Sequence, residues 1–414
     1  MKKNKNRFLL GFFFGMLAMA VVVGGVGTGL YFANQNTSGK TISEKTSQKL
    51  DYINKLIDAK FLNKVNESDL EDGIYKGLLE GLNDPYSVYY TAEEYRKMME
   101  QTSGTYSGIG ALVSQNAETG IITVVKAFAD APAAKAGVKN GDIIYKVKGK
   151  EVTGVDINNV VTEMKGEKGT TVDITVYRES EKKYIDFTIT RDQVNEPTVE
   201  YKMLDKKKKI GYIQISQFEE VTYDQFTKAL DDLKKQGMKA VIFDVRSNPG
   251  GLYETVCKML DEILPEGNLV STKDKYGNEE KQTSDSKCLD MPMVVLQNKD
   301  SASASEIFAG AIQDFNAGKI VGTQSFGKGI VQTILPLSDG SAVKLTVQDY
   351  YTPSGKNIHG KGITPDVEAE LEENATSDTQ LEKAKETIME LMKRKTAHIS
   401  CKRRYMYGLF LCFE

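Results

Sequence analysis

The N-terminal part of the chain has the pattern of short amphipathic helices. Apolar residues recur at helical spacing over residues 49–60, and two further helical stretches cover residues 68–82 and the highly charged residues 92–101. The second stretch begins with S-D-L-E, the signal of a capping box, and ends before Asn83-Asp84-Pro85, which stops a helix. The pattern predicts a small helical region without side chains of evident chemistry.

From Gly104 to Arg191 the pattern changes to an alternation of apolar and polar positions. Valine, isoleucine and threonine gather in short runs that turn signals separate, and one helical stretch, residues 156–165, interrupts them. The predicted strands cover residues 110–113, 121–125, 143–147, 171–177 and 184–189. The pattern predicts a β-rich module of fewer than about 100 residues.

Between Ile210 and about Val367, strands alternate with helices. The run Ala240–Val245 is apolar except for Asp244, as expected of a strand that is buried on both faces of a parallel sheet. Predicted strands are 210–215, 240–245, 292–296, 320–322, 330–336 and 342–351; predicted helices are 223–236, 252–264 and a stretch ending at residue 315. In such sheets, functional residues gather in the loops after the carboxyl ends of the strands.

The C-terminal end of the chain has two parts. Residues 380–394 have the spacing of an amphipathic helix. Residues 397–414 mix basic and apolar side chains in a way that fits nothing before them. This segment is equally compatible with a cloning or frameshift remnant and with a membrane-binding end.

Composition narrows the classes of function. A chain of 414 residues is too long for one ordinary core, so two or three domains are expected. A net charge of −3 gives no basic surface for nucleic acid. The four cysteines lack the spacing of a metal site or a disulfide framework, and we expect neither a metal nor a cofactor. The two histidines, His359 and His398, are few for a hydrolase that works through imidazole.

The first residues predict a membrane anchor. Four basic residues precede an uncharged run from Phe8 to Phe32, which is long enough to span a hydrocarbon core of about 30 Å. A cleaved signal peptide is the alternative, but its apolar region is usually shorter and no A-x-A-like site follows the run. Tyr31 and Phe32 are typical interfacial residues. The basic side places the N-terminus in the cytoplasm and the remainder outside it.

The β-rich module carries a recognisable signature. The segment 131–144, APAAKAGVKNGDII, resembles the signature of bacterial PDZ domains. The resemblance implies a module that binds an extended peptide by strand addition. Gly108, Ile109, Gly110 and Ala111 then correspond to the loop that binds the peptide's terminal carboxylate, with bared N–H groups as an anion nest. A plain glycine-rich turn is the alternative for these residues.

Two short motifs of the α/β region contain residue types that occur in the active sites of hydrolases. Ser303 and Glu306 form an S-x-x-E capping box, which by itself indicates only a helix start, yet helix N–H groups there can stabilise an oxyanion. Lys328 lies between two glycines, which usually indicates a solvated charge, but apolar Ile330 and Val331 follow at once. A lysine amine in an apolar site favours its neutral form and can act as a general base.

Together, the SASASE and FGKGIVQ segments resemble the C-terminal processing proteases, serine peptidases with a Ser–Lys dyad. The resemblance extends from about residue 50 to 390. It implies that Ser303 is the nucleophile, that Lys328 is its general base and that Gln332 holds the lysine amine.

The same resemblance assigns the neighbouring motif, residues 244–251. It implies an oxyanion hole made by the backbone N–H groups of Gly251 and Ala304. The residues to which it gives a supporting role are Arg246, Gly250, Glu306 and Asp314. A Ser–His–Asp arrangement that uses His359 remains the alternative.

These observations predict a multidomain α/β protein with a crotonase-like serine-protease core. The expected parts are an anchor (1–35), a linker with helices (36–103), a PDZ domain (104–191), a peptidase core (192–375), and a C-terminal helix with its tail (376–414). The expected function is that of a membrane-anchored, extracytoplasmic endopeptidase. Its expected partners are proteins or peptides with accessible C-termini and the membrane; a homo-oligomer is left open. A silent PDZ scaffold and a crotonase-like acyl-CoA enzyme are the alternatives.

Overall fold

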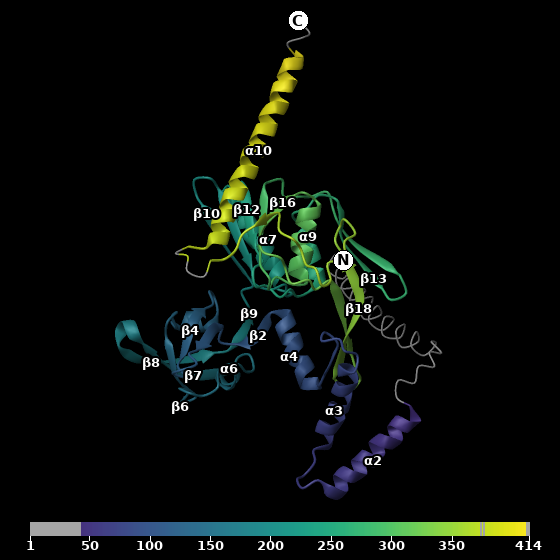
Figure 1. Cartoon of the computed structure of the whole chain (residues 1–414). Coiled ribbons are helices and arrows are strands. Elements are labelled where there is room, and N and C mark those ends of the chain that lie inside the picture. The colour runs from purple at the N-terminus through teal and green to yellow at the C-terminus, as the bar shows by residue number, and fades with distance from the viewer. Residues whose placement is uncertain (1–42, 373–374, 376, 411–414) are drawn as a thin grey trace, which may run out of the picture. The chain divides into compact units, whose positions relative to one another are not determined.

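The computed structural model describes residues 43–372, 375 and 377–410 (Figure 1). The chain divides into two units, one up to Leu70 and one from Glu71 onward. Helix α2 (Glu44–Lys60) belongs to the first unit and is capped by the Ser43 hydroxyl, which accepts from the Thr46 N–H. None of the described helices is long and apolar enough to cross a membrane. The predicted anchor lies outside the described residues.

The caps of the next helices differ from the sequence prediction. Helix α3 (Glu67–Glu80) starts before Ser68, and the Asn66 side chain accepts from the Ser68 N–H, so the predicted cap at Ser68 is wrong. A full capping box instead precedes α4 (Ala92–Ser103), where Thr91 and Glu94 bond reciprocally. Strand β1 (Val88–Tyr90) lies between these two helices in the chain.

The β-rich module is a sheet of strand order β3-β4-β5-β7-β8, with β6 on β5 and a separate β2–β9 pair. Its strands are β2 (Thr105–Gly108), β3 (Ala111–Gln115), β4 (Ile122–Ala127), β5 (Ile143–Val147), β6 (Lys150–Glu151), β7 (Thr171–Arg178), β8 (Lys183–Thr190) and β9 (Asp192–Asn195), and its helices are α5 (Pro132–Ala136) and α6 (Ile157–Met164). The buried Asp142 carboxylate of the signature's Gly-Asp turn binds Arg178 through two oxygens, at 2.7 and 2.8 Å. This bidentate pair joins the turn to β7 and explains why the signature needs an aspartate there.

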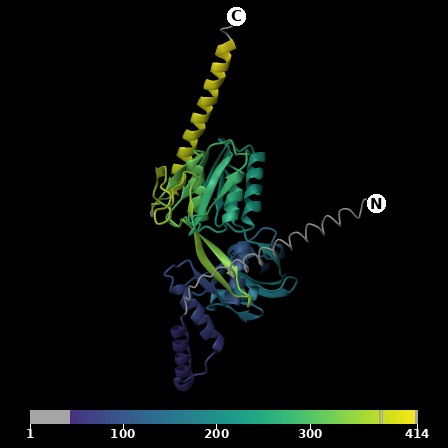
Figure 2. The ribbon, with the colours of Figure 1, turned by 90° about the vertical axis from the view of Figure 1, so that its right-hand side faces the viewer.

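The core sheet has the order β10-β11-β12-β15-β16-β19, and its strands from β11 to β19 run parallel. They are β10 (Val199–Asp205), β11 (Ile210–Ile215), β12 (Ala240–Asp244), β15 (Met293–Gln297), β16 (Gly318–Gly322) and β19 (Val367–Glu368). Helices α7 (Thr222–Lys235), α8 (Tyr253–Asp261) and α9 (Ala304–Asp314) pack on Phe243 and Val295 of one face. Helix α10 (Thr379–Phe410) packs on Ile242 and Val294 of the other, and Figure 2 shows the sheet between them.

A second sheet is built from β1, β13 (Gly267–Asp274), β14 (Glu279–Ser284), β17 (Ile330–Pro336) and β18 (Ala342–Tyr351). Strands β17 and β18 were predicted as two separate strands at residues 330–336 and 342–351, whereas β13 and β14 were not predicted. Helix α10 continues to Phe410, so it includes most of the segment that the sequence left unexplained.

Candidate active site

Two loops meet where the neighbouring parallel strands β12 and β15 end. The Asn248 carbonyl oxygen accepts from the Ala302 N–H at 3.0 Å and from the Ser305 hydroxyl at 2.9 Å. The Ser301 hydroxyl donates to the Val245 carbonyl oxygen at 2.8 Å. Two of the three serines in the SASAS motif are therefore buried ties between the loops, and Ser303 is the one that lines the adjoining cleft.

Ser303 has a strained backbone. It precedes α9 with a φ of 56° and a ψ of −114°, a conformation that a residue with a side chain rarely adopts. The Glu306 carboxylate accepts from its N–H at 2.8 Å, and the buried Tyr350 hydroxyl donates to its carbonyl oxygen at 3.2 Å. Strain of this kind costs about 1–3 kcal/mol and persists only where the surroundings hold it in place.

The two glycines of the neighbouring loop allow a close approach to Ser303. A Cβ on Gly250 would lie 2.9 Å from the Ser303 Cβ, and a Cβ on Gly251 would lie 2.2 Å from the Phe218 carbonyl oxygen. Both glycines also have a positive φ, so a side chain at either position would meet steric overlap and backbone strain. Within the described residues, the N–H groups of Gly251 and Ala304 take part in none of the hydrogen bonds that tie these loops together.

Glu306 joins the Ser303 loop to the loop of Lys328. Its fully buried carboxylate accepts four hydrogen bonds, at 2.6–2.8 Å, and no cation pairs with it in the described part of the chain. The donors are the N–H of Ser303, the hydroxyl of Ser325, the N–H of Gly327 and the N–H of Lys328. Sequence reasoning identified this residue as a helix cap, with a supporting role implied by the family resemblance, and in the structure its carboxylate links the two motifs.

The Lys328 amine is half-buried in the same cleft as Ser303. Burial, aided by the positive charge of Lys344, lowers the pKa of Lys328, while Asp84 and Glu306 oppose the shift. Its Nζ lies 4.6 Å from the centroid of the Tyr86 ring. The predicted contact with Gln332 is absent from the described residues, because the Gln332 amide donates to the Thr346 hydroxyl at 3.3 Å.

The cleft has a volume of about 510 Å³ and is walled by residues that are far apart in the sequence. Tyr90 and α4 supply part of the wall, the Phe218–Glu219 segment and Gly251 another part, and β17 and β18 the rest. It lies at the carboxyl ends of the parallel strands, where functional residues were expected.

Glu219 is an unpaired buried acid in this wall. Its Oε2 has no hydrogen-bond partner among the described residues and packs where a side chain on Gly104 would otherwise lie. Burial, aided by the charge of Glu196, raises the pKa of Glu219 to about 7. The fold therefore prefers the protonated acid.

We expect Glu219→Gln to stabilise the protein at pH 8 but not at pH 4. Below its ordinary pKa of 4.5 the acid is neutral whether the chain is folded or unfolded, so its burial costs no charge. Between that value and about 7 the acid ionises in the unfolded chain but stays protonated in the folded one, so the folded state loses stability until the pH reaches about 7. The glutamine variant avoids this loss, which we expect to be about 2–3 kcal/mol. Urea unfolding at both pH values measures it; exposed Glu220→Gln is the control, and an equal effect at pH 4 would contradict the explanation.

Three other predicted residues do not line the cleft that holds Ser303 and Lys328. Arg246 binds the Asp244 and Asp378 carboxylates, so it fixes the loop after β12 to the start of α10. Asp314 ends α9 and accepts from the Ser354 N–H at 3.0 Å. His359 is exposed and does not line the cleft, although its backbone approaches Gly329.

Sequence reasoning missed the contribution of the segment after α3. It interpreted residues 83–85 only as a helix stop, and it saw no chemistry in the helical region. In the structure Tyr86 lies against the Lys328 amine, and the Asp84 charge acts on it. Periodicity carries no signal for such a contact; the proximity of aromatic residues to a stop motif, Y-S-V-Y-Y, was the only hint.

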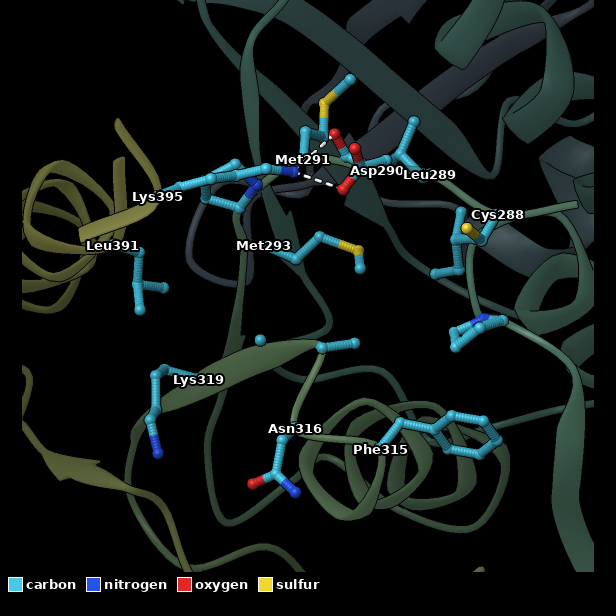
Figure 3. A pocket seen from close by; sticks show the side chains of 15 residues that line it. Cys288, Leu289, Asp290, Met291, Met293, Phe315, Asn316, Lys319, Leu391 and Lys395 are labelled. Carbon is cyan, nitrogen blue, oxygen red and sulfur yellow. Dashed lines mark hydrogen bonds and ion pairs between the residues drawn. The ribbon is translucent and has the colours of Figure 1, made fainter. Parts of the chain in front are cut away.

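A second cavity, of about 370 Å³, lies at the opposite, amino ends of β15 and β16 (Figure 3). Lys395 of α10 reaches across it to the Asp290 carboxylate and donates to the Asp290 carbonyl oxygen at 2.8 Å. Lys319, which also lines it, is paired with Asp366 at 2.8 Å. Both lysines are thus engaged in ion pairs, and the cavity contains no serine beside a free amine.

The fold and the cleft define a serine-type peptidase core joined to a PDZ module, and comparisons with known proteins agree. Residues 209–369 match the model of peptidase family S41, residues 107–189 the PDZ domain, and residues 27–94 the N-terminal domain of the activating protease CtpB. A probable CtpA-like serine protease of Staphylococcus epidermidis is 36% identical over 85% of this chain and 71% of its own length. One of Staphylococcus aureus is 36% identical over 81% and 67%.

Among solved structures, a putative S41 protease from Bacteroides fragilis matches with a TM-score of 0.51. It is 15% identical and aligns over 82% of this chain and 93% of that one, which supports the fold alone. The relatives at 36% identity settle the family: the chain belongs to peptidase family S41, is similar to CtpA-like serine proteases and contains a PDZ domain. The resemblance to the C-terminal processing proteases and the prediction of a serine peptidase are confirmed.

Proposed function

We propose that Ser303 and Lys328 form the catalytic dyad of this peptidase. The observation that carries the proposal is the shared buried carboxylate of Glu306, which fixes both loops against one cleft. The neutral Lys328 amine takes the proton of the Ser303 hydroxyl as its oxygen attacks the scissile carbonyl carbon. The lysine ammonium then gives this proton to the leaving amine, and an acyl-enzyme remains. Water, activated by the same amine, hydrolyses the acyl-enzyme and restores the serine.

The N–H groups of Gly251 and Ala304 serve in this proposal as the oxyanion hole. Both belong to the loops that meet beside Ser303, and the close approach of Gly250 to Ser303 sets their spacing. Donors held in place before the reaction stabilise the developing negative charge without reorganisation. Gln332 is proposed to orient the lysine once a substrate is bound, when the amine turns toward Ser303.

The PDZ module is proposed to select substrates by their C-termini. Gly108 ends β2, Ala111 begins β3, and the turn between them consists of Ile109 and Gly110, which has a φ of 75°. Such a turn presents N–H groups to a carboxylate. The uncharged run from Phe8 to Phe32, with basic residues before it, supports the further proposal that the chain is anchored in the membrane with its peptidase outside the cytoplasm.

A fluorophosphonate probe tests the dyad directly. We expect it to label one serine covalently, and peptide mapping by mass spectrometry to place the label on Ser303. Lys328→Met is expected to slow the labelling, because the hydroxyl then lacks its base. A label on another serine, or an active enzyme that takes no label, would refute the assignment; a silent PDZ scaffold would show neither labelling nor cleavage.

A further inference from the structure

We propose that Tyr86 is a positioning residue for the peptidase reaction: the face of its ring holds the Lys328 amine between turnovers and thereby sets how readily Lys328 becomes a free base. The inference rests on the proposed role of Lys328. It assigns a catalytic purpose to the segment between α3 and β1, which the sequence pattern presented only as a helix stop.

The Tyr86 ring belongs to a segment that is firmly attached to the second sheet. The Asp84 carboxylate accepts from the Tyr86 N–H at 3.1 Å and from the Ser87 hydroxyl at 2.6 Å. The Ser87 hydroxyl in turn accepts from the Thr346 N–H of β18 at 3.0 Å. Directly after it, β1 pairs antiparallel with β18, with Val88 opposite Lys344. The ring is therefore fixed relative to the strands that follow Lys328 in the chain.

The acidic groups near Lys328 are already occupied. Glu306 accepts four hydrogen bonds and Asp84 accepts from its own turn, and neither forms an ion pair with the lysine among the described residues. The neighbouring Lys344 has an aromatic partner of its own, since its Nζ lies 5.4 Å from the centroid of the Tyr90 ring. Within the described residues, the Lys328 amine forms no hydrogen bond or ion pair, and its partner is the Tyr86 ring, whose centroid lies 4.6 Å from it.

A ring face attracts an ammonium group but not a neutral amine. Burial and the charge of Lys344 lower the pKa of Lys328, while the charges of Asp84 and Glu306 oppose the shift. In this proposal the Tyr86 ring adds to that opposition, because it stabilises the protonated form. The ring thus keeps the lysine inside the cleft while limiting the fraction of neutral base. When a substrate enters, the deprotonated amine loses its attraction to the ring and is free to turn to the Ser303 hydroxyl.

The experiment weakens the attraction of the ring face for a cation while it keeps the shape of the ring almost unchanged. Tyr86→Phe is compared with variants that carry mono-, di- and trifluorinated phenylalanine at position 86, and the fluorophosphonate labelling rate is measured against pH. Successive fluorines withdraw electron density from the ring, which then stabilises the ammonium less. We therefore expect the midpoint at which the labelling rate rises with pH to move stepwise to lower pH, by about half to one unit in total. Tyr86→Leu is expected to shift it at least as far. Coinciding midpoints across the fluorinated series would overturn the proposal.

Two controls separate this proposal from the dyad itself. If Lys328→Met keeps the parent midpoint, the rise does not report Lys328, and the proposed function fails. If the rise of the labelling rate with pH disappears in Lys328→Met but all fluorinated variants have the same midpoint, the dyad stands and only the role of Tyr86 is refuted. The same series at exposed Tyr276, whose ring centroid lies 5.0 Å from the Lys275 Nζ and which does not line the cleft, is expected to leave the midpoint in place. An equal shift there would also overturn the assignment to Tyr86.

Discussion

Replacing Ser303 with alanine, or Lys328 with methionine, is expected to lower kcat/KM on an unfolded protein substrate by at least about 1,000-fold. Alanine at 303 removes the nucleophile. Methionine at 328 fits the half-buried space next to Tyr86 but has no proton acceptor. Because the two residues act as one unit, the double variant is expected to be no less active than the poorer single variant. Initial rates of cleavage at saturating and limiting substrate concentrations measure both kcat and kcat/KM.

Lys319→Met is the matched control for the lysine substitution. Lys319 also belongs to the peptidase core, but it lines the second cavity and pairs with Asp366. We expect it to retain nearly full activity. Binding of a peptide with a free C-terminal carboxylate, followed by fluorescence anisotropy, is expected to be unchanged in all these variants. Undiminished proteolysis by Ser303→Ala or Lys328→Met would rule out the dyad.

Much of the core could be predicted because its residues are locally consistent. The apolar run ending at Asp244 forms a strand that is buried on both faces, and the run at 292–296 forms its parallel neighbour. Two such strands bring their following loops to one edge of the sheet. The sequence could thus place Ser303 near the Gly250-Gly251 loop, and in the structure a Cβ on Gly250 would lie 2.9 Å from the Ser303 Cβ.

What the sequence could not predict depends on residues that are far apart in the chain. Strand β14 is polar along nearly its whole length and exists because β13 offers it a partner, so periodicity gave no signal for it. The environment of Lys328 is a similar case. Its flanking glycines suggested a solvated charge, whereas burial and the charge of Lys344, from another segment, lower the pKa of Lys328. Tyr86, from a third segment, lies against its amine.

The capping-box motif at Ser303 shows the same limit within one motif. The sequence correctly indicated a helix start and a bond from Glu306 back to Ser303. It could not show that the other donors to this carboxylate come from the Lys328 loop, since nothing local relates residues 306 and 327. Glu306, which caps a helix, thus also links the Ser303 loop to the Lys328 loop.

Glu306→Gln is therefore expected to impair both stability and catalysis, although it changes a single atom. The carboxylate oxygens each accept two hydrogen bonds, and glutamine offers one acceptor oxygen and one amide group that can only donate. At least one backbone N–H would face the amide, leaving buried donors unpaired at a cost of about 2–4 kcal/mol. The Ser303 and Lys328 loops would then move apart, and we expect kcat to fall by at least about 100-fold, with a smaller change in KM.

Asp314→Asn is the matched control, because it makes the same change at the other end of α9. Asp314 accepts from the Ser354 N–H through one oxygen, and asparagine keeps an oxygen for that bond. We expect its unfolding midpoint in urea and its kcat to stay close to those of the parent. The pair of variants separates a general effect on α9 from the specific loss of the link between the loops. If Glu306→Gln lowered stability but kept the parent kcat, Glu306 would be a structural residue alone, and the alignment of Ser303 with Lys328 would have to come from Tyr86 and β18.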